Sequence, residues 1–238
     1  KITCDPEEAL LGVIAAKVGR PLRWRETRSE SMMNMGHGRA QLQYVTIGGT
    51  RDGKVTHYQL HLFQDAGGFM DVGGVLGFAM TRPMAQAVYD IANVECRATT
   101  GLTNTTPTVP YRGAGRPEAT AAAERAMDLF AAEIGKDPAE VRRMNLIPKF
   151  LDSHATAIGH TYDVGDYEGA LDKALEAAGY ADLRAEQARR REAGDDKQLG
   201  IGVSVSVEIT GDVDLVRRVW EANDALGNVF IWQCLLSF

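Results

Sequence analysis

The chain has 238 residues, of which 45% are hydrophobic and 24% charged, a composition typical of globular proteins large enough to bury a core. Its formal net charge of −6 leaves no basic surplus to neutralise phosphates, which argues against nucleic acid as the main partner. No signal peptide or run of membrane-spanning length is evident, and three scattered cysteines favour a reducing, cytoplasmic setting over a disulfide framework.

The first part of the chain predicts helices followed by a hairpin. Asp5 and Pro6 begin a stretch with helical apolar spacing that ends near Arg20. Residues 21–26 (PLRWRE) predict a short strand, and residues 28–38 predict a helical turn. Two alternating runs then flank an Asp-Gly pair at residues 52–53, which predicts a β-hairpin.

The glycine-dense segment 65–78 predicts a loop or a closely packed turn, and residues 93–104 predict another strand. The remaining expected elements are four helices, over 117–134, 137–147, 166–180 and 181–194, and a strand over Leu199–Thr210. Hairpin strands followed by helices favour an α+β fold, with mixed or antiparallel strands and packed helices.

The segment TVPYRGAGRPE (108–118) is the most informative stretch for function. Gly113 and Gly115 flank the small Ala114, so the backbone can lie close to a ligand. Pro117 suits the first position of the following helix, and Arg112 adds a permanent charge beside the loop. Such a loop at a helix N-terminus offers backbone N–H groups to an anionic or oxygen-rich ligand.

Other site types have little support. The segment lacks the third glycine of a dinucleotide fingerprint and the Lys-Ser/Thr of a P-loop. His57 and His61 lie on one face of a predicted strand but about 13 Å apart, too far to share a metal ion. The sequence contains no G-x-S-x-G elbow, so a serine hydrolase is unsupported. The helix-face carboxylates Glu118, Glu124 and Asp128 are expected to be structural or solvated, and none is expected to act as a general base.

The stretch LTNTTPTVPYRGAGRPEATAAAERAMDLFAAEIGKDPAEVRRMNLI strongly resembles the molybdenum hydroxylase family, the molybdopterin-binding large subunits of xanthine dehydrogenases, aldehyde oxidases and carbon monoxide dehydrogenases. The opening residues resemble the family segment that follows a glycine-rich loop, with Lys1 as the final residue of that loop. The resemblance covers Lys1 to about Thr210.

This resemblance implies a molybdenum ion on a pyranopterin, in the cytosine dinucleotide form usual among bacterial relatives. Such enzymes oxidise a carbon centre with oxygen from water, and electrons leave through Fe–S clusters and FAD on partner subunits. By resemblance, Tyr111, Arg112, Gly113 and Ala114 line the cofactor site, and Arg112 is the expected catalytic residue nearest the molybdenum. No residue of this chain is expected to bind the metal directly.

Departures from the family pattern bear on the substrate. Ile2 and Met80 stand where purine-oxidising members carry a glutamate and an arginine, and Ala114 replaces an aromatic residue. Gly113 stands where copper-containing carbon monoxide dehydrogenases carry a cysteine. An aldehyde or N-heterocycle is therefore the favoured substrate, with CO retained as an alternative.

The expected organisation has three parts. Residues 1–148 form the first part of the molybdopterin-binding domain, residues 149–210 a helical connector and the start of a strand region, and residues 211–238 an unassigned tail. Because Lys1 is not an initiator Met, the chain is expected to be a fragment, inactive alone, whose partners are the rest of the large subunit, an Fe–S small subunit, an FAD medium subunit and a small-molecule substrate. The alternative is a non-catalytic relic or interaction domain that retains the fold without the metal.

Overall fold

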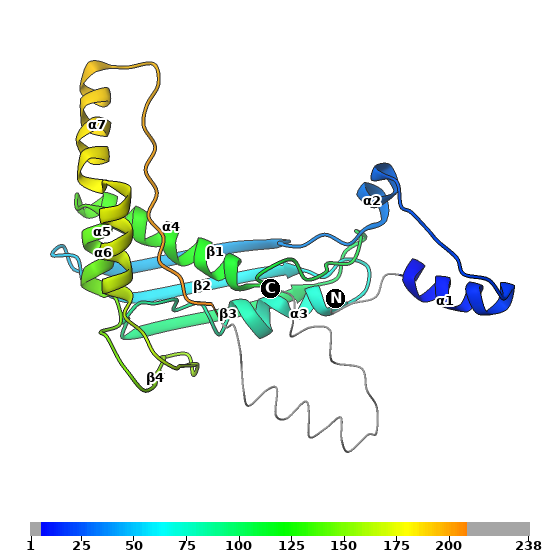
Figure 1. The fold of residues 1–238 in the computed structure, drawn as a ribbon. Coiled ribbons are helices and arrows are strands. Elements are labelled where there is room, and N and C mark those ends of the chain that lie inside the picture. The colour runs from blue at the N-terminus through cyan, green and yellow to red at the C-terminus, as the bar shows by residue number, and fades with distance from the viewer. Residues whose placement is uncertain (1–5, 209–238) are drawn as a thin grey trace.

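A computed structural model describes residues 6–208 (Figure 1). The helices are α1 (Pro6–Val18), α2 (Arg28–Asn34), α3 (Val72–Leu76), α4 (Arg116–Ile134), α5 (Pro138–Asn145), α6 (Tyr167–Ala178) and α7 (Tyr180–Ala193), with a π-helical turn, η1, at Gly77–Thr81. The strands are β1 (Gln41–Gly49), β2 (Val55–Asp65), β3 (Asn93–Gly101), and the short β4 (His154–Ala155) and β5 (Thr161–Tyr162). The predicted α+β class is confirmed.

The main sheet has the strand order β1-β2-β3 and is mixed. β1 pairs with β2 in antiparallel register, whereas β2 and β3 are parallel. The predicted hairpin turn is confirmed: the amide of Gly53 donates to the carbonyl of Thr50, and Gly53 has a φ of +111°. Glycine reaches this left-handed region without steric cost, which explains the Asp-Gly pair.

Helix α4 covers one face of the sheet (Figure 1). Strand β2 turns Tyr58, Leu60 and Leu62 into the core, where each is at most 2% exposed. The helix meets this face mainly with small side chains, which let its backbone approach the strands closely. The buried residues of α4 that are apolar are Ala119, Ala122, Ala123, Ala126, Met127, Phe130 and Ala131.

The opposite face of the sheet is open within the described residues. Leu42, Tyr44 and Phe63 lie on it and are 56, 59 and 40% exposed. The rings of Tyr44 and Phe63 meet edge to face at 6.1 Å. This face therefore carries apolar side chains that no described element covers.

Three expectations for the secondary structure are wrong. Residues 21–26 are not a strand: no described strand pairs with them, and Leu22 and Trp24 are exposed. Residues 199–208 form no ladder either, because the segment packs its alternating valines onto the core without a neighbouring strand; residues 209–210 lie outside the described part. The segment 65–78 is not only a loop, since α3 and η1 begin within it.

Helices α5, α6 and α7 lie together at one end of the sheet, while α1 and α2 extend from the other end (Figure 1). Within residues 6–208, none of the helices is long and apolar enough to cross a bilayer. The expected cap Asp5 and the tail 211–238 lie outside the described residues.

Candidate functional site

The loop before α4 has three consecutive residues in the left-handed region. Gly113, Ala114 and Gly115 have φ values of +89°, +44° and +94°. The amide of Ala114 donates to the carbonyl of Tyr111 at 2.7 Å, and the amide of Arg116 donates to that of Gly113 at 3.1 Å. Two glycines tolerate this path, whereas Ala114 is strained by it.

Gly113 and Ala114 are half-buried in this loop, whereas Gly115 is buried. Among the described residues, no acceptor receives the amides of Gly113 and Gly115. Tyr111 is 65% exposed and Arg112 is also exposed, so neither side chain is packed into the core. Consecutive residues with such backbone angles can turn amides toward an anion or an oxygen ligand.

The loop lies against η1, about thirty-five residues earlier in the chain. A Cβ built on Gly115 would lie 2.8 Å from the Cβ of Met80 and 3.0 Å from the carbonyl oxygen of Leu76. The Thr81 hydroxyl donates to the Gly115 carbonyl at 2.9 Å and accepts from the Gln41 side chain at 2.9 Å. The structure therefore brings Met80 to the loop, whereas Ile2 lies outside the described residues.

Arg39 contacts the same loop and was not predicted from the sequence. Its guanidinium donates to the Glu118 carboxylate at 2.7 Å and to the carbonyl of Arg112. It also lies over the Tyr111 ring, 5.1 Å from the centroid. The only local hint in the sequence is a basic residue directly after Gly-His-Gly, which is too weak to identify a contact 73 positions away.

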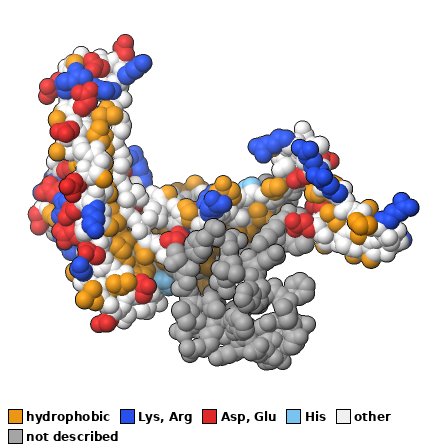
Figure 2. Space-filling model, in the orientation of Figure 1, with side chains coloured by type: hydrophobic (Ala, Val, Ile, Leu, Met, Phe, Trp, Pro, Cys, Tyr) orange, Lys and Arg blue, Asp and Glu red, His pale blue; other side chains and the backbone are white. Residues whose placement is uncertain are grey.

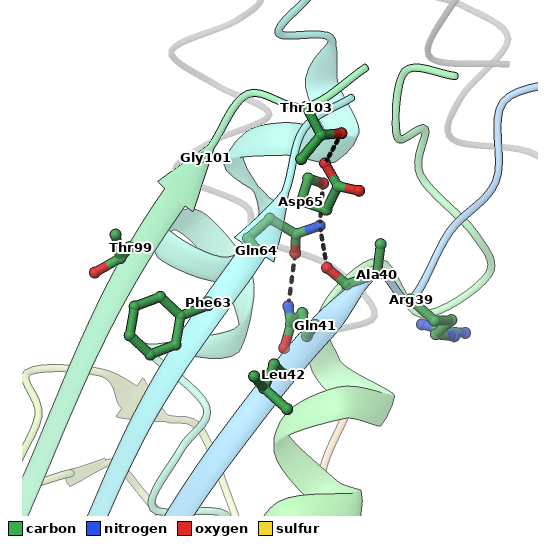
Figure 3. Close-up of a pocket in the computed structure, with 10 residues that line it drawn as sticks. All are labelled: Arg39, Ala40, Gln41, Leu42, Phe63, Gln64, Asp65, Thr99, Gly101 and Thr103. Atoms are coloured by element: carbon green, nitrogen blue, oxygen red, sulfur yellow. Dashed lines mark hydrogen bonds between the residues drawn. The ribbon is translucent and has the colours of Figure 1, made fainter. Parts of the chain in front are cut away.

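A hollow of about 510 Å³ begins at Arg39 and extends across the ends of the three strands (Figure 3). Leu42 and Phe63 form its apolar part, and a Gln41–Gln64 side-chain hydrogen bond of 2.9 Å lies beside it. None of residues 111–114 lines this hollow. Arg39 lines the hollow and contacts the loop directly, and Gln41, which also lines the hollow, is linked to the loop through the Thr81 hydroxyl.

Asp65 organises the polar end of the hollow. Its carboxylate accepts the amide of Gly67 at 2.8 Å and the hydroxyls of Thr103 and Thr105 at 2.8 and 3.2 Å. The Gly67 amide, followed by the Thr103 hydroxyl, holds the pKa of Asp65 below its ordinary value. These bonds order the chain that leads from β3 to the loop.

The acidic residues of α4 have structural partners. Arg142, which is fully buried, donates to the Glu124 carboxylate at 2.8 Å and pairs with Asp128 at 2.9 Å. Glu124 also accepts the Tyr89 hydroxyl at 2.5 Å and the amide of Val205 at 3.1 Å. Together with the Arg39–Glu118 pair, these contacts give each of the three carboxylates an arginine partner.

The histidines form no metal centre in the part of the chain that the structure describes. His57 and His61 both lie on β2, as predicted. Within residues 6–208, no group of three or more His, Cys, Asp or Glu side chains is arranged to hold a metal ion.

Comparisons with known proteins agree on one family. A model described as the molybdopterin cofactor-binding domain matches residues 1–146. The chain is 33% identical to the carbon monoxide dehydrogenase large chain of Hydrogenophaga pseudoflava, over 84% of this chain and 25% of that protein. It is 28% identical to the nicotine 6-hydroxylase large subunit of Paenarthrobacter nicotinovorans, over 92% of this chain and 27% of that protein.

Among solved structures, quinoline 2-oxidoreductase from Pseudomonas putida 86 matches with a TM-score of 0.72 and 26% identity, over 82% of this chain and 25% of that chain. The chain thus spans about a quarter of the length of the relatives that it matches.

Proposed function

The chain belongs to the molybdenum hydroxylase family, and from this premise we propose that it forms the first part of the molybdopterin-binding domain of a larger catalytic subunit. In this proposal residues 1–148 belong to that domain, residues 149–210 connect it to the next region, and residues 211–238 have no assigned role. The match of the family model to residues 1–146 supports the first boundary. A non-catalytic relic is not favoured by these similarities.

The observation that carries the proposal is the run of left-handed residues from Gly113 to Gly115, in which the two glycine amides have no acceptor among the described residues. The chemistry of this loop fits an anionic, oxygen-bearing cofactor, because backbone donors and the Arg112 cation lie together. When bound, the molybdenum of a molybdopterin supplies a centre that accepts two electrons from the substrate. Tyr111, Arg112, Gly113 and Ala114 would hold and orient this group, with the cytosine dinucleotide form proposed by resemblance.

An aldehyde or N-heterocycle is the proposed substrate class. Met80 lies beside the loop and Ala114 is small, so this side offers neither an arginine nor an aromatic ring to a purine. Gly113 offers no thiolate for a copper ion, which weakens the case for CO. The names of the nicotine 6-hydroxylase and quinoline 2-oxidoreductase relatives support an N-heterocycle.

Exposed apolar surface supports action within a larger assembly. Helix α1 exposes Leu10, Val13, Ile14 and Val18 by 44 to 66%, and Figure 2 shows hydrophobic side chains on this arm. A helix face of such apolar residues is normally covered in the folded protein. The proposed partners are the rest of the large subunit, an Fe–S small subunit and an FAD medium subunit, which would carry electrons away.

The test is Arg112→Ala in the full-length assembled enzyme, with Arg189→Ala on α7 as a control for loss of an exposed arginine. We expect turnover per molybdenum on a panel of aldehydes and N-heterocycles to fall about 100-fold or more, because a charged group beside the reacting centre is lost. Metal analysis reports cofactor content separately. If both turnover and molybdenum content match the wild type, the proposed role of Arg112 is wrong.

A further inference from the structure

We propose that Arg39 is a positioning residue that fixes the loop from Tyr111 to Gly115, and this inference rests on the cofactor-binding role proposed for that loop. Arg39 lies just before β1, beyond Ala40 and outside the core (Figure 3). Its backbone belongs to a segment 73 positions away from Arg112, so this contact is tertiary.

The Arg39 guanidinium makes three contacts, two with the loop and one with the first turn of α4. Nη1 donates to Glu118 in the first turn of α4 at 2.7 Å, and Nη2 donates to the carbonyl of Arg112. The same group stacks on the Tyr111 ring at 5.1 Å. The left-handed residues 113–115 lie between Arg112 and Glu118, so Arg39 joins the two ends of this strained run.

The chain around Arg39 is shaped to make these contacts. The amide of Val109 donates to the carbonyl of His37 at 2.9 Å, and His37 forms a parallel bridge with Thr108. A Cβ on Gly38 would lie 2.7 Å from the Cβ of Tyr111, so only glycine allows this approach. Arg39 itself has a φ of +67°, which is uncommon for a residue with a side chain.

Such backbone strain persists only where surrounding contacts fix it, and it gathers at functional sites. Here both the holding residue and the held loop contain a strained non-glycine residue, Arg39 and Ala114. The Glu118 side chain is only 9% exposed, so the charge of Arg39 also neutralises a carboxylate with little access to water. The geometry thus sets where the amides of Gly113 and Gly115 point.

Two variants separate charge from geometry. Arg39→Lys keeps one positive charge that can pair with Glu118, but one ammonium cannot reproduce the planar fork that also reaches the Arg112 carbonyl. Arg39→Ala removes all three contacts, to Glu118, the Arg112 carbonyl and the Tyr111 ring. Arg189→Ala, which removes an exposed α7 arginine paired with Glu186, is the matched control.

The first measurement is amide hydrogen exchange of peptides covering residues 108–118, in the full-length assembled enzyme. We expect exchange to rise about tenfold or more in Arg39→Lys and Arg39→Ala, as loss of a hydrogen bond from a charged donor predicts, and to stay unchanged in Arg189→Ala. The second is the electron paramagnetic resonance signal of the partly reduced enzyme, compared at equal molybdenum content. A displaced loop alters this signal, whereas a mere loss of fold stability lowers the content of cofactor without changing the signal of what remains.

The two proposals fail in different ways. If the wild-type assembly holds no molybdenum, the proposed function is wrong, and the exchange data still report whether Arg39 holds the loop. If the wild type holds molybdenum but Arg39→Lys has wild-type exchange and a wild-type signal, the positioning role is overturned. Should Arg39→Ala fail to assemble, Arg39→Lys alone decides the question.

Discussion

The side chain of Asn145 accepts a hydrogen bond from the backbone amide of Val55 at 2.8 Å, across 90 positions of sequence. Its Nδ2 group also donates to the carbonyls of Gly53 and Val141, each at 2.8 Å. One buried amide therefore ties the end of α5 to the turn between β1 and β2. These three hydrogen bonds explain why an asparagine occupies this buried position at the end of α5.

Asn145→Ala removes the side-chain partner of the buried Val55 amide and of the Gly53 carbonyl, together with a second bond to the Val141 carbonyl. We expect the free energy of unfolding to fall by about 2 kcal/mol or more, measured by urea denaturation. Asn145→Asp keeps the acceptor for the Val55 amide but loses the donors to both carbonyls. We therefore also expect a substantial fall in the free energy of unfolding for this variant. A change within about 0.5 kcal/mol for both variants would show that these bonds contribute little.

Glu124→Ala leaves the fully buried Arg142 with Asp128 as its remaining acidic partner. Because a buried charge that loses a partner is costly, we expect a loss of about 3 kcal/mol in unfolding free energy. Glu95→Ala breaks an exposed pair with Arg97 and should cost less than about 1 kcal/mol. Equal losses in the two variants would contradict a special role for the buried network.

Because Tyr89 is buried, we expect the protein to lose stability in alkaline solution. Burial, followed by the charge of Glu124, raises the pKa of Tyr89 well above 10.0. A group whose pKa is higher in the folded state stabilises the fold fully below its unfolded-state pKa. This stabilisation is lost as the pH rises from the unfolded-state pKa towards the folded-state pKa. Above about pH 10, the wild type should therefore lose stability more steeply than Tyr89→Phe, with exposed Tyr44→Phe as the control.

Urea denaturation at pH 7 and pH 10.5 checks this prediction. At pH 7, Tyr89→Phe should be less stable by about 1–3 kcal/mol, because Glu124 loses a buried hydrogen-bond donor. The difference in unfolding free energy between the wild type and Tyr89→Phe should be smaller at pH 10.5 than at pH 7. Parallel pH curves for the wild type and Tyr89→Phe would refute the assignment.

Gly73 lies against the backbone that leads into the loop. A Cβ there would lie 2.1 Å from the carbonyl oxygen of Thr108 and 2.5 Å from the amide nitrogen of Val109. Gly73→Ala must displace this segment, so we expect a loss of about 1–3 kcal/mol and less molybdenum in the assembled enzyme. Gly48→Ala is the matched control, since a Cβ at Gly48 meets nothing within 4 Å.

Denaturant midpoints and metal analysis of both glycine variants decide this point. Wild-type values for Gly73→Ala would mean that the Thr108 segment moves without cost. A loss in Gly48→Ala equal to that of Gly73→Ala would mean that the effect comes from replacing a glycine and not from the contact of Gly73 with the Thr108 segment.

Several features follow from sequence alone, because their causes are local. Asp-Gly determines the turn at Gly53, Pro138 begins α5, and alternation in β2 selects the face that is buried. Pro117, expected at the first position of a helix, is the second residue of α4. The loop from Tyr111 to Gly115 is also predicted from sequence, since two glycines permit left-handed backbone angles and the proline that follows favours the start of a helix. The resemblance then indicated the family, which the comparisons confirm.

Only the tertiary structure decided which distant groups meet. Ladder formation depends on a neighbouring strand, so alternation within residues 199–208 could not reveal that this segment packs without one. The parallel pairing of β3 with β2, the burial of Arg142 beside Glu124 and the contact of Arg39 with Arg112 all join residues far apart in the chain. Sequence patterns report the conformation of neighbouring residues, whereas charge pairing and loop placement depend on the packing of the whole fold.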